Sequence, residues 1–142
     1  MKALKTGKIT FPSRSVNEGF ARSALSAFAA QAEPTRDELA DVKTAVSEAV
    51  TNCIVHAYAN TIGPITLTAA LYEDGTLRVA VADKGCGIPD VSKAMEPLFT
   101  TGGAERAGLG FAVMESFMDS VKVRSAPGKG TRVTLSKRLG TR

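Results

Sequence analysis

Several residue types are scarce in this sequence of 142 residues, which has no tryptophan, one histidine and two cysteines. Cys53 and Cys86 form no CxxC pair, so the sequence predicts neither a disulfide framework nor a zinc site and favours a reducing cytoplasm. It has no apolar run long enough to cross a bilayer, and no secretory signal at the N-terminus. We therefore expect a cytoplasmic protein without a membrane partner, folded as one domain over residues 1–142.

Acidic residues are unevenly distributed, since residues 120–142 hold seven basic side chains and no acidic one. Residues 1–32 are also basic, whereas residues 33–119 are acidic. A net charge of +4 suggests nucleic acid as a first candidate partner. No basic stripe interleaved with aromatic residues accompanies the charge, so the sequence predicts no direct nucleic-acid contact. A solvated surface, or an acidic protein partner for the basic N-terminal segment, explains the pattern instead.

Hydrophobic periodicity predicts the first half of the fold. A short strand is expected at residues 8–11 and an alanine-rich helix at residues 16–31, the latter with Phe20 on its apolar face. A capping box then starts a second helix that runs to about residue 59. Thr35 is its N-cap, and Glu38 reaches back. The expected core stripe of this helix comprises Leu39, Val42, Val46, Ala49, Cys53 and Ala57.

The second half of the chain alternates strands with turns. Strands are expected at residues 65–71 and 77–82, around a turn at residues 73–75. After a turn at residues 83–89 we expect the following elements in order: a short helical piece at 91–95, a glycine-rich loop at 97–110, a helix at 111–117, and a hairpin with strands at 121–124 and 132–137. This order predicts the α+β class, as a two-layer sandwich with helices on one face of a mixed sheet.

Two segments carry the residues typical of a nucleotide site. Glu48, Asn52 and His56 recur every four residues, so we expect them on one face of the second helix, away from its core stripe. Asn52 offers a neutral oxygen to Mg²⁺ that already carries phosphate ligands, and Glu48 can act as a general base. Asp83 can accept a hydrogen bond from an adenine amino group. Gly85 and Gly87 both lack a Cβ, so a base can lie against the backbone at either position.

A second glycine motif is expected to hold phosphate. Gly108, Leu109 and Gly110 precede the predicted helix at residues 111–117, whose N-terminal amides can bind an anion. Arg106 lies in the preceding loop and can reach a terminal phosphate when the loop closes. Together these motifs predict phosphoryl transfer from an adenine nucleotide.

The order of these motifs resembles the ATP-binding superfamily of gyrase, heat-shock chaperones, histidine kinases and mismatch-repair ATPases. Within it the chain is similar to the family of sporulation anti-sigma F factors. The matching segments are Asn17–Arg22, Val46–Asn52, Pro97–Thr101, Gly108–Phe111 and Met114–Asp119.

The resemblance implies a serine kinase that is also an anti-sigma factor and forms homodimers. Such proteins bind ATP with Mg²⁺, inhibit a sporulation RNA polymerase sigma factor, and phosphorylate a serine of an anti-anti-sigma partner. By position it implies Glu48 as catalytic base, Asn52 as Mg²⁺ ligand, and Asp83 as adenine reader. Arg22 is implied in partner binding. Implied nucleotide contacts are Thr100, Thr101, Arg106 and Thr131, besides the glycine motifs.

One departure from the family and three alternative functions accompany this interpretation. The lid segment after Thr101, residues 102–106, is shorter and richer in glycine than we expect for this family. Such a lid loses more entropy on closing and holds ATP less tightly. A sigma-binding module with little catalysis is one alternative. The others are the ATPase domain of a histidine kinase, which lacks its dimerisation helices here, and a chaperone- or gyrase-like ATPase, which needs further domains. His56 is left between a phospho-acceptor and a structural role.

Overall fold

The computed structural model describes residues 2–88 and 103–140, with residues 103–109 described by their backbone alone. Between them these residues form five strands and three longer helices. In chain order the elements are β1 (Ala3–Pro12), α1 (Asn17–Ala29), a 3₁₀ turn η1 (Ala30–Ala32), α2 (Arg36–Asn52), a π-helical turn η2 (Cys53–Ala57), β2 (Pro64–Tyr72), β3 (Thr76–Asp83), α4 (Gly103–Phe117), β4 (Ser120–Ala126) and β5 (Gly130–Arg138).

The strands form one sheet in the order β1-β2-β3-β5-β4. All four pairings between described strands are antiparallel, so the expected mixed sheet is corrected to an antiparallel one. Two of the four pairings are hairpins, in which the tight turns at Gly75 and at Gly128 reverse the chain between neighbouring strands. The β3–β5 register places Asp83 directly opposite Thr131.

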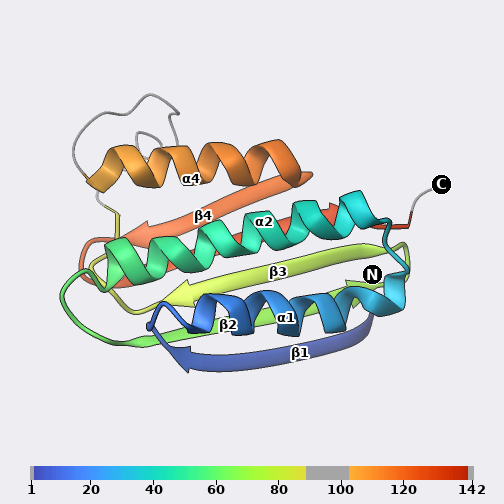
Figure 1. The fold of residues 1–142 in the computed structure, drawn as a ribbon, viewed down its shortest axis with the longest axis horizontal. Coiled ribbons are helices and arrows are strands. Elements are labelled where there is room, and N and C mark those ends of the chain that lie inside the picture. Colours follow the sequence, from blue (N-terminus) through green and yellow to red (C-terminus); the bar gives the residue numbers. More distant parts are fainter. Residues whose placement is uncertain (1, 89–102, 141–142) are drawn as a thin grey trace.

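The helices form a second layer over one face of the sheet (Figure 1). Helix α2 lies between α1 and α4 and contacts both, and it covers the central strands β3 and β5. Every second residue of β2 is buried, which is the pattern of a strand with one face on a core. The predicted α+β two-layer sandwich is therefore confirmed. Among the described residues, no helix combines the length and the apolar character that a bilayer span requires.

Helix α2 begins as the sequence predicts. The Thr35 hydroxyl accepts the backbone N–H of Glu38 at 3.1 Å, and the Glu38 carboxylate accepts the backbone N–H of Thr35 at 2.8 Å. The same Glu38 oxygen also accepts the backbone N–H of Gly140 at 3.2 Å. The capping carboxylate thus joins the start of the helix to the end of the described chain. The predicted core stripe is confirmed at Val42, Val46 and Ala49.

Helix boundaries differ from the expectation at three places. Helix α2 ends at Asn52 and continues as the π-helical turn, instead of as an α-helix to residue 59. Helix α4 begins at Gly103, eight residues before the predicted start. Phe20, expected on the apolar face of α1, is 49% exposed, and its ring lies edge-to-face with that of Phe11, with centroids 5.9 Å apart. The helical piece expected at residues 91–95 lies outside the described residues.

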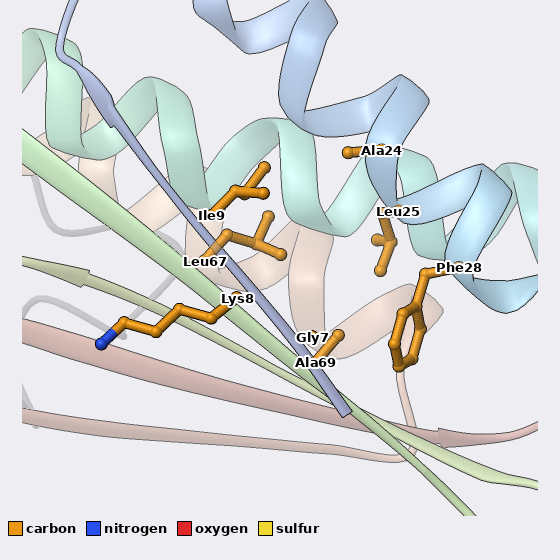
Figure 2. A pocket seen from close by; sticks show the side chains of 8 residues that line it. All are labelled: Gly7, Lys8, Ile9, Ala24, Leu25, Phe28, Leu67 and Ala69. Atoms are coloured by element: carbon orange, nitrogen blue, oxygen red, sulfur yellow. The ribbon is translucent and has the colours of Figure 1, made fainter. Parts of the chain in front are cut away.

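A small apolar hollow separates α1 from the sheet (Figure 2). It has a volume of about 70 Å³ and lies where Gly7 of β1 pairs with Ala69 of β2. Phe28 and Leu25 reach down from α1 on one side, as Figure 2 shows, whereas Lys8 points away from the helix. The hollow exists because the two smallest side chains of the β1–β2 pairing face each other under the helix.

Candidate nucleotide site

Glu48 and Asn52 lie one turn apart near the end of α2, as their spacing predicts. Both side chains meet α4 at Gly110. A Cβ added to Gly110 would lie 3.3 Å from Glu48 Oε2, 3.2 Å from Asn52 Nδ2 and 3.3 Å from Asn52 Oδ1. A larger residue at this position would require the two polar side chains to move by a few tenths of an ångström. The structure therefore brings three predicted site residues together.

The carboxamide of Asn52 is short of a hydrogen-bond partner. Its Nδ2 atom is buried, and no donor or acceptor within the described part of the protein pairs with it. Buried polar groups are almost always satisfied, so this N–H donor beside a carboxylate indicates a place for an acceptor atom of a ligand, such as a phosphate oxygen, while Oδ1 of the same amide can turn to a cation. The described residues contain no group of three or more acidic, histidine or cysteine side chains that could hold a metal ion by themselves. A neutral oxygen that completes the coordination of a phosphate-bound Mg²⁺ fits this site.

Asp83 lies at the end of β3 with three donors around its carboxylate. Its Oδ1 atom accepts the backbone N–H of Gly85 at 2.9 Å and that of Thr131 at 3.2 Å. Its Oδ2 atom accepts the thiol of Cys53 at 3.4 Å. Because Cys53 directly follows Asn52, this contact fixes Asp83 next to the end of α2. Asp83 is 9% exposed.

The fold requires glycine at positions 85 and 87 for a packing reason that no local sequence pattern reveals. A Cβ on Gly85 would collide with the carbonyl of Ala57, and a Cβ on Gly87 would collide with the carbonyl of Ala126. Gly87 also has a φ of 77°, in the left-handed region that glycine favours. Both glycines let the turn after β3 pack against the π-helical turn and the β4–β5 hairpin. Their expected contact with a base stays a prediction.

Two residues outside the predicted site shape it. The Tyr58 hydroxyl accepts the backbone N–H of Lys84 at 2.6 Å and donates to the Pro64 carbonyl at 2.7 Å, which anchors the turn after Asp83. Burial raises the pKa of Tyr58. Burial, followed by the nearby charge of Asp83, raises the pKa of the Cys53 thiol well above its ordinary value, so it stays protonated and donates. The sequence places Cys53 only on an apolar stripe and gives no sign of this bond.

Thr131 is the other predicted nucleotide contact that the structure places at the site. Its hydroxyl lies 2.8 Å from that of Ser125, and its backbone N–H donates to Asp83. The Ser125 hydroxyl accepts the backbone N–H of Ile88 at 2.7 Å. Ser125 therefore joins the turn after β3 to the β4–β5 hairpin. Its role depends on strand register, which no local sequence pattern reveals.

The second glycine motif differs from the prediction. Gly108, Leu109 and Gly110 lie inside α4 instead of before it. Only the first four N–H groups of a helix are unpaired, so the amides of these three residues take part in the helix hydrogen bonds. Arg106 lies in the same helix and is described by its backbone alone. Thr100 and Thr101 lie outside the described residues.

His56 follows the α-helical row of Glu48 and Asn52 in a turn of different spacing. It belongs to the π-helical turn η2, in which the backbone N–H of Tyr58 donates to the carbonyl of Cys53 at 3.0 Å, five residues earlier. Glu48 and Asn52 therefore share the α-helical part of the predicted row, and His56 lies beyond its end.

Arg22 lies on α1, beside Ser47 of α2, the residue directly before Glu48. Its Nε atom is 2.7 Å from the Glu18 carboxylate, which also accepts the Ser47 hydroxyl of α2. The Arg22 side chain is 44% exposed. A surface hollow between the two helices is lined by Ser15, Glu18, Arg22, Ser47, Thr51, Ile54 and Val55. Glu18 thus holds Arg22 over a concave surface that adjoins the Glu48–Asn52 face.

Comparison with known proteins gives a consistent result. Residues 11–137 match the model of the histidine kinase-like ATPase domain family. The chain is 57% identical over 134 residues to an anti-sigma F factor of Caldanaerobacter subterraneus, which covers 94% of this chain and 93% of the relative. It is 54% identical to an anti-sigma F factor of a Thermoanaerobacter species, with 94% of each chain covered.

Solved structures show the same architecture. A crystal structure of the RsbU and RsbW domains of a Mycobacterium tuberculosis protein superposes with a TM-score of 0.70 and 26% sequence identity. The match covers 95% of this chain and 32% of that chain. The resemblance therefore extends over nearly the whole fold described above.

Proposed function

Because this chain belongs to the anti-sigma F factor family and has the histidine kinase-like ATPase domain over residues 11–137, we propose that it is an ATP-dependent protein serine kinase and anti-sigma factor. It binds and inhibits a sporulation sigma factor and so regulates transcription in the cytoplasm. It also phosphorylates a serine of an anti-anti-sigma partner. The observation that carries the proposal is the meeting of Glu48, Asn52 and Gly110 beside the anchored Asp83.

Glu48 is the proposed catalytic base. It takes the proton of the serine hydroxyl as that oxygen bonds to the terminal phosphorus of ATP and the bond to ADP breaks. Asp83 accepts a hydrogen bond from the adenine amino group, because among the described residues its Oδ2 atom is bonded only by the weak thiol donor of Cys53. Asn52 holds Mg²⁺, which when bound neutralises charge on the phosphates.

Arg22 is the proposed partner contact. A guanidinium held by one carboxylate keeps donors for a second carboxylate, and the hollow beside it suits an acidic side chain. The protein is further proposed to act as a homodimer. The free edge of β1, which pairs only with β2 among the described strands, supports this proposal.

A second candidate is a nucleotide-dependent sigma-binding module with little or no kinase activity. The position of Gly108 to Gly110 inside α4 favours it, because helix hydrogen bonds take up the amides that would hold phosphate. Under this alternative ATP changes the affinity for the sigma factor, and the partner protein gains no phosphoryl group.

A phosphotransfer assay distinguishes the two functions. We expect a purified anti-anti-sigma protein, incubated with the wild-type protein, ATP and Mg²⁺, to gain the mass of one phosphoryl group. Glu48→Gln should keep ATP binding but slow transfer by about 10²- to 10⁴-fold, which is the usual contribution of a general base.

Glu73→Gln serves as the matched control, because Glu73 is an exposed acid at the far end of the sheet. It should transfer phosphate at the wild-type rate. Transfer by Glu48→Gln at that same rate would remove Glu48 from the proposed role. Absence of transfer by the wild-type protein, with ATP-dependent sigma binding intact, would establish the second candidate.

A further inference from the structure

The sheet face opposite the helices carries positive charge and no strand residue of the opposite sign. Residues paired across an antiparallel sheet lie on the same face, so the registers identify which side chains share this open sheet face. Its basic members are Lys8, Arg78, Lys122, Arg124, Arg132 and Arg138. Its other strand positions carry small, hydroxyl or apolar side chains and Tyr72.

Four of these cations surround a hollow on β3, β4 and β5. The hollow has a volume of about 320 Å³, and its lining consists of Arg78, Ser120, Lys122, Arg124, Arg132, Thr134 and Ser136. The registers pair Arg124 with Arg132, Lys122 with Thr134, and Arg78 with Ser136. The middle strand β5 therefore carries Arg132, Thr134 and Ser136, with Lys122 and Arg124 beside it on β4 and Arg78 beside it on β3.

Within the described part of the chain, none of the four cations of the hollow forms an ion pair with a carboxylate. The two ion pairs between described residues are Arg22 with Glu18, and Lys137 with Asp41, and neither involves this face. Arg124 and Arg132 are directly opposite each other on neighbouring strands, a placement that destabilises a sheet when the charges are alike. A feature that opposes folding and converges on a concave surface indicates a ligand of opposite charge.

Tyr72 orients one of the four cations. The Arg78 guanidinium lies over the Tyr72 ring, 5.1 Å from its centroid, and donates to the Tyr72 hydroxyl at 3.2 Å. A guanidinium fixed at one end keeps its remaining N–H groups in a set direction. Preorganisation of this kind lowers the entropy lost when a ligand binds.

We propose that this hollow binds a small polyanion with several phosphate groups. Guanidinium groups donate to phosphate oxygens in pairs, and the hydroxyls of Ser120, Thr134 and Ser136 add neutral donors at the floor. Strands β3 and β4 lie on either side of β5, about two strand spacings of 4.8 Å apart, and Lys122 is two residues beyond the position opposite Arg78, so the Cα atoms of these two cations are roughly 12 Å apart. A short chain of phosphates spans that distance and contacts both sides.

Other acidic ligands suit the hollow less well. Single-stranded nucleic acid binds on aromatic platforms, and the one aromatic ring among the strand residues of this face is covered by Arg78. A protein partner needs buried apolar anchors, and cations and hydroxyl groups line this hollow instead. A second copy of the same face would bring like charges together. The site lies on the sheet face opposite α2 and is separate from the proposed nucleotide site.

Tripolyphosphate titration of the ¹⁵N-labelled protein tests the proposal, with ADP and Mg²⁺ present in excess so that the proposed nucleotide site is filled. We expect amide shifts to concentrate at Lys122, Arg124, Arg132 and Thr134. The double variant Arg124→Gln/Arg132→Gln should bind tripolyphosphate at least about tenfold more weakly than the wild-type protein, because two charge-assisted contacts are lost. Arg14→Gln/Arg36→Gln, which removes two exposed arginines elsewhere, should change the affinity less than about twofold.

If both double variants lose affinity for tripolyphosphate equally, net charge alone explains the loss and the proposed site is rejected. Shifts located away from β4 and β5 would do the same. A single-stranded oligonucleotide or polyglutamate that binds these amides more tightly than tripolyphosphate would overturn the ligand class.

A thermal measurement adds an independent test, because it needs no labelled amide. Arg132→Thr should raise the Tm at low salt, since it removes the repulsion with Arg124. Tripolyphosphate should raise the Tm of the wild-type protein more than that of Arg132→Thr. A lower Tm for Arg132→Thr, or an equal gain with tripolyphosphate, would contradict the proposal.

Discussion

Asp83 receives three donors from the chain itself, two of them backbone N–H groups and one the thiol of Cys53. A carboxylate with this many fixed donors cannot rotate without breaking several bonds. The donors come from three different places in the chain, namely the start of η2, the turn after β3 and the start of β5. The orientation of Asp83 is therefore a product of the tertiary fold.

The Cys53 thiol gives the first prediction at the scale of a residue. Because the pKa of Cys53 is raised in the folded protein, the folded state keeps the thiol proton at a pH where the unfolded state loses it. The stabilisation is full below about pH 8.5, the ordinary pKa of a thiol, and is lost as the pH rises towards the raised value. We expect the free energy of unfolding to fall by up to about 1.4 kcal/mol per pH unit above that point.

Urea unfolding between about pH 7.5 and pH 10 measures this slope. Cys53→Ala should flatten it, whereas Cys86→Ala, at the exposed cysteine, should leave it unchanged. The raised pKa of Tyr58 adds a similar decline only above about pH 10. Parallel curves for the wild-type protein and Cys53→Ala would show that the thiol has no such role.

At the scale of elements, the parts of the fold that follow a simple period were predictable. The capping box at Thr35, the apolar stripe of α2 and the two hairpins each depend on neighbours in the sequence. The start of α4 was not predictable from the sequence. Gly103, Gly108 and Gly110 each lower helix propensity by about 1 kcal/mol, so the segment resembles a loop. Packing of α4 on α2, with Phe111 and Met114 buried, outweighs that preference.

The hollow between α1 and the sheet gives a prediction for the packing of these elements. Ala69→Val adds two methyl groups at the buried position opposite Gly7 and should raise the free energy of unfolding by about 1 kcal/mol. Ala70→Val is the matched control, because it makes the same change on the open sheet face of the same strand. Chemical denaturation compares the two. Equal gains would mean that strand propensity, not the filled hollow, is responsible.

At the scale of the whole molecule, strand register assembles the candidate site. The sequence identified Glu48, Asn52 and Asp83 separately, because their spacing and their turn are local patterns. It gave no indication that Asp83 faces Thr131, that Cys53 reaches Asp83 or that Gly110 covers Asn52. Those contacts join segments 30 to 58 residues apart, which no local period encodes.

The position of Arg22 on the helical side of the molecule gives a prediction about partner binding. Arg22 lies in the helical layer, and the proposed partners meet it through acidic side chains. We expect Arg22→Glu to weaken sigma-factor binding by about tenfold or more, because it replaces an attraction by a repulsion. The wild-type complex should also weaken as salt increases. Isothermal titration at two ionic strengths measures both effects.

Arg36→Glu is the control for that experiment, since Arg36 is exposed at the start of α2 and lies outside the hollow beside Arg22. It should alter the affinity far less than Arg22→Glu. An affinity that neither salt nor Arg22→Glu changes would exclude an electrostatic contact at Arg22.

The glycines inside α4 have a consequence for the speed and strength of nucleotide binding. If phosphate is to reach the amides of Gly108 to Gly110, the helix bonds of those amides must first open. The measured dissociation constant then equals the intrinsic one divided by the fraction of molecules that are open. The same glycines make the opening less costly than it would be in an alanine-rich helix. Under the proposed function, the sequence of α4 therefore helps to set the ATP concentration at which half of the nucleotide sites are filled.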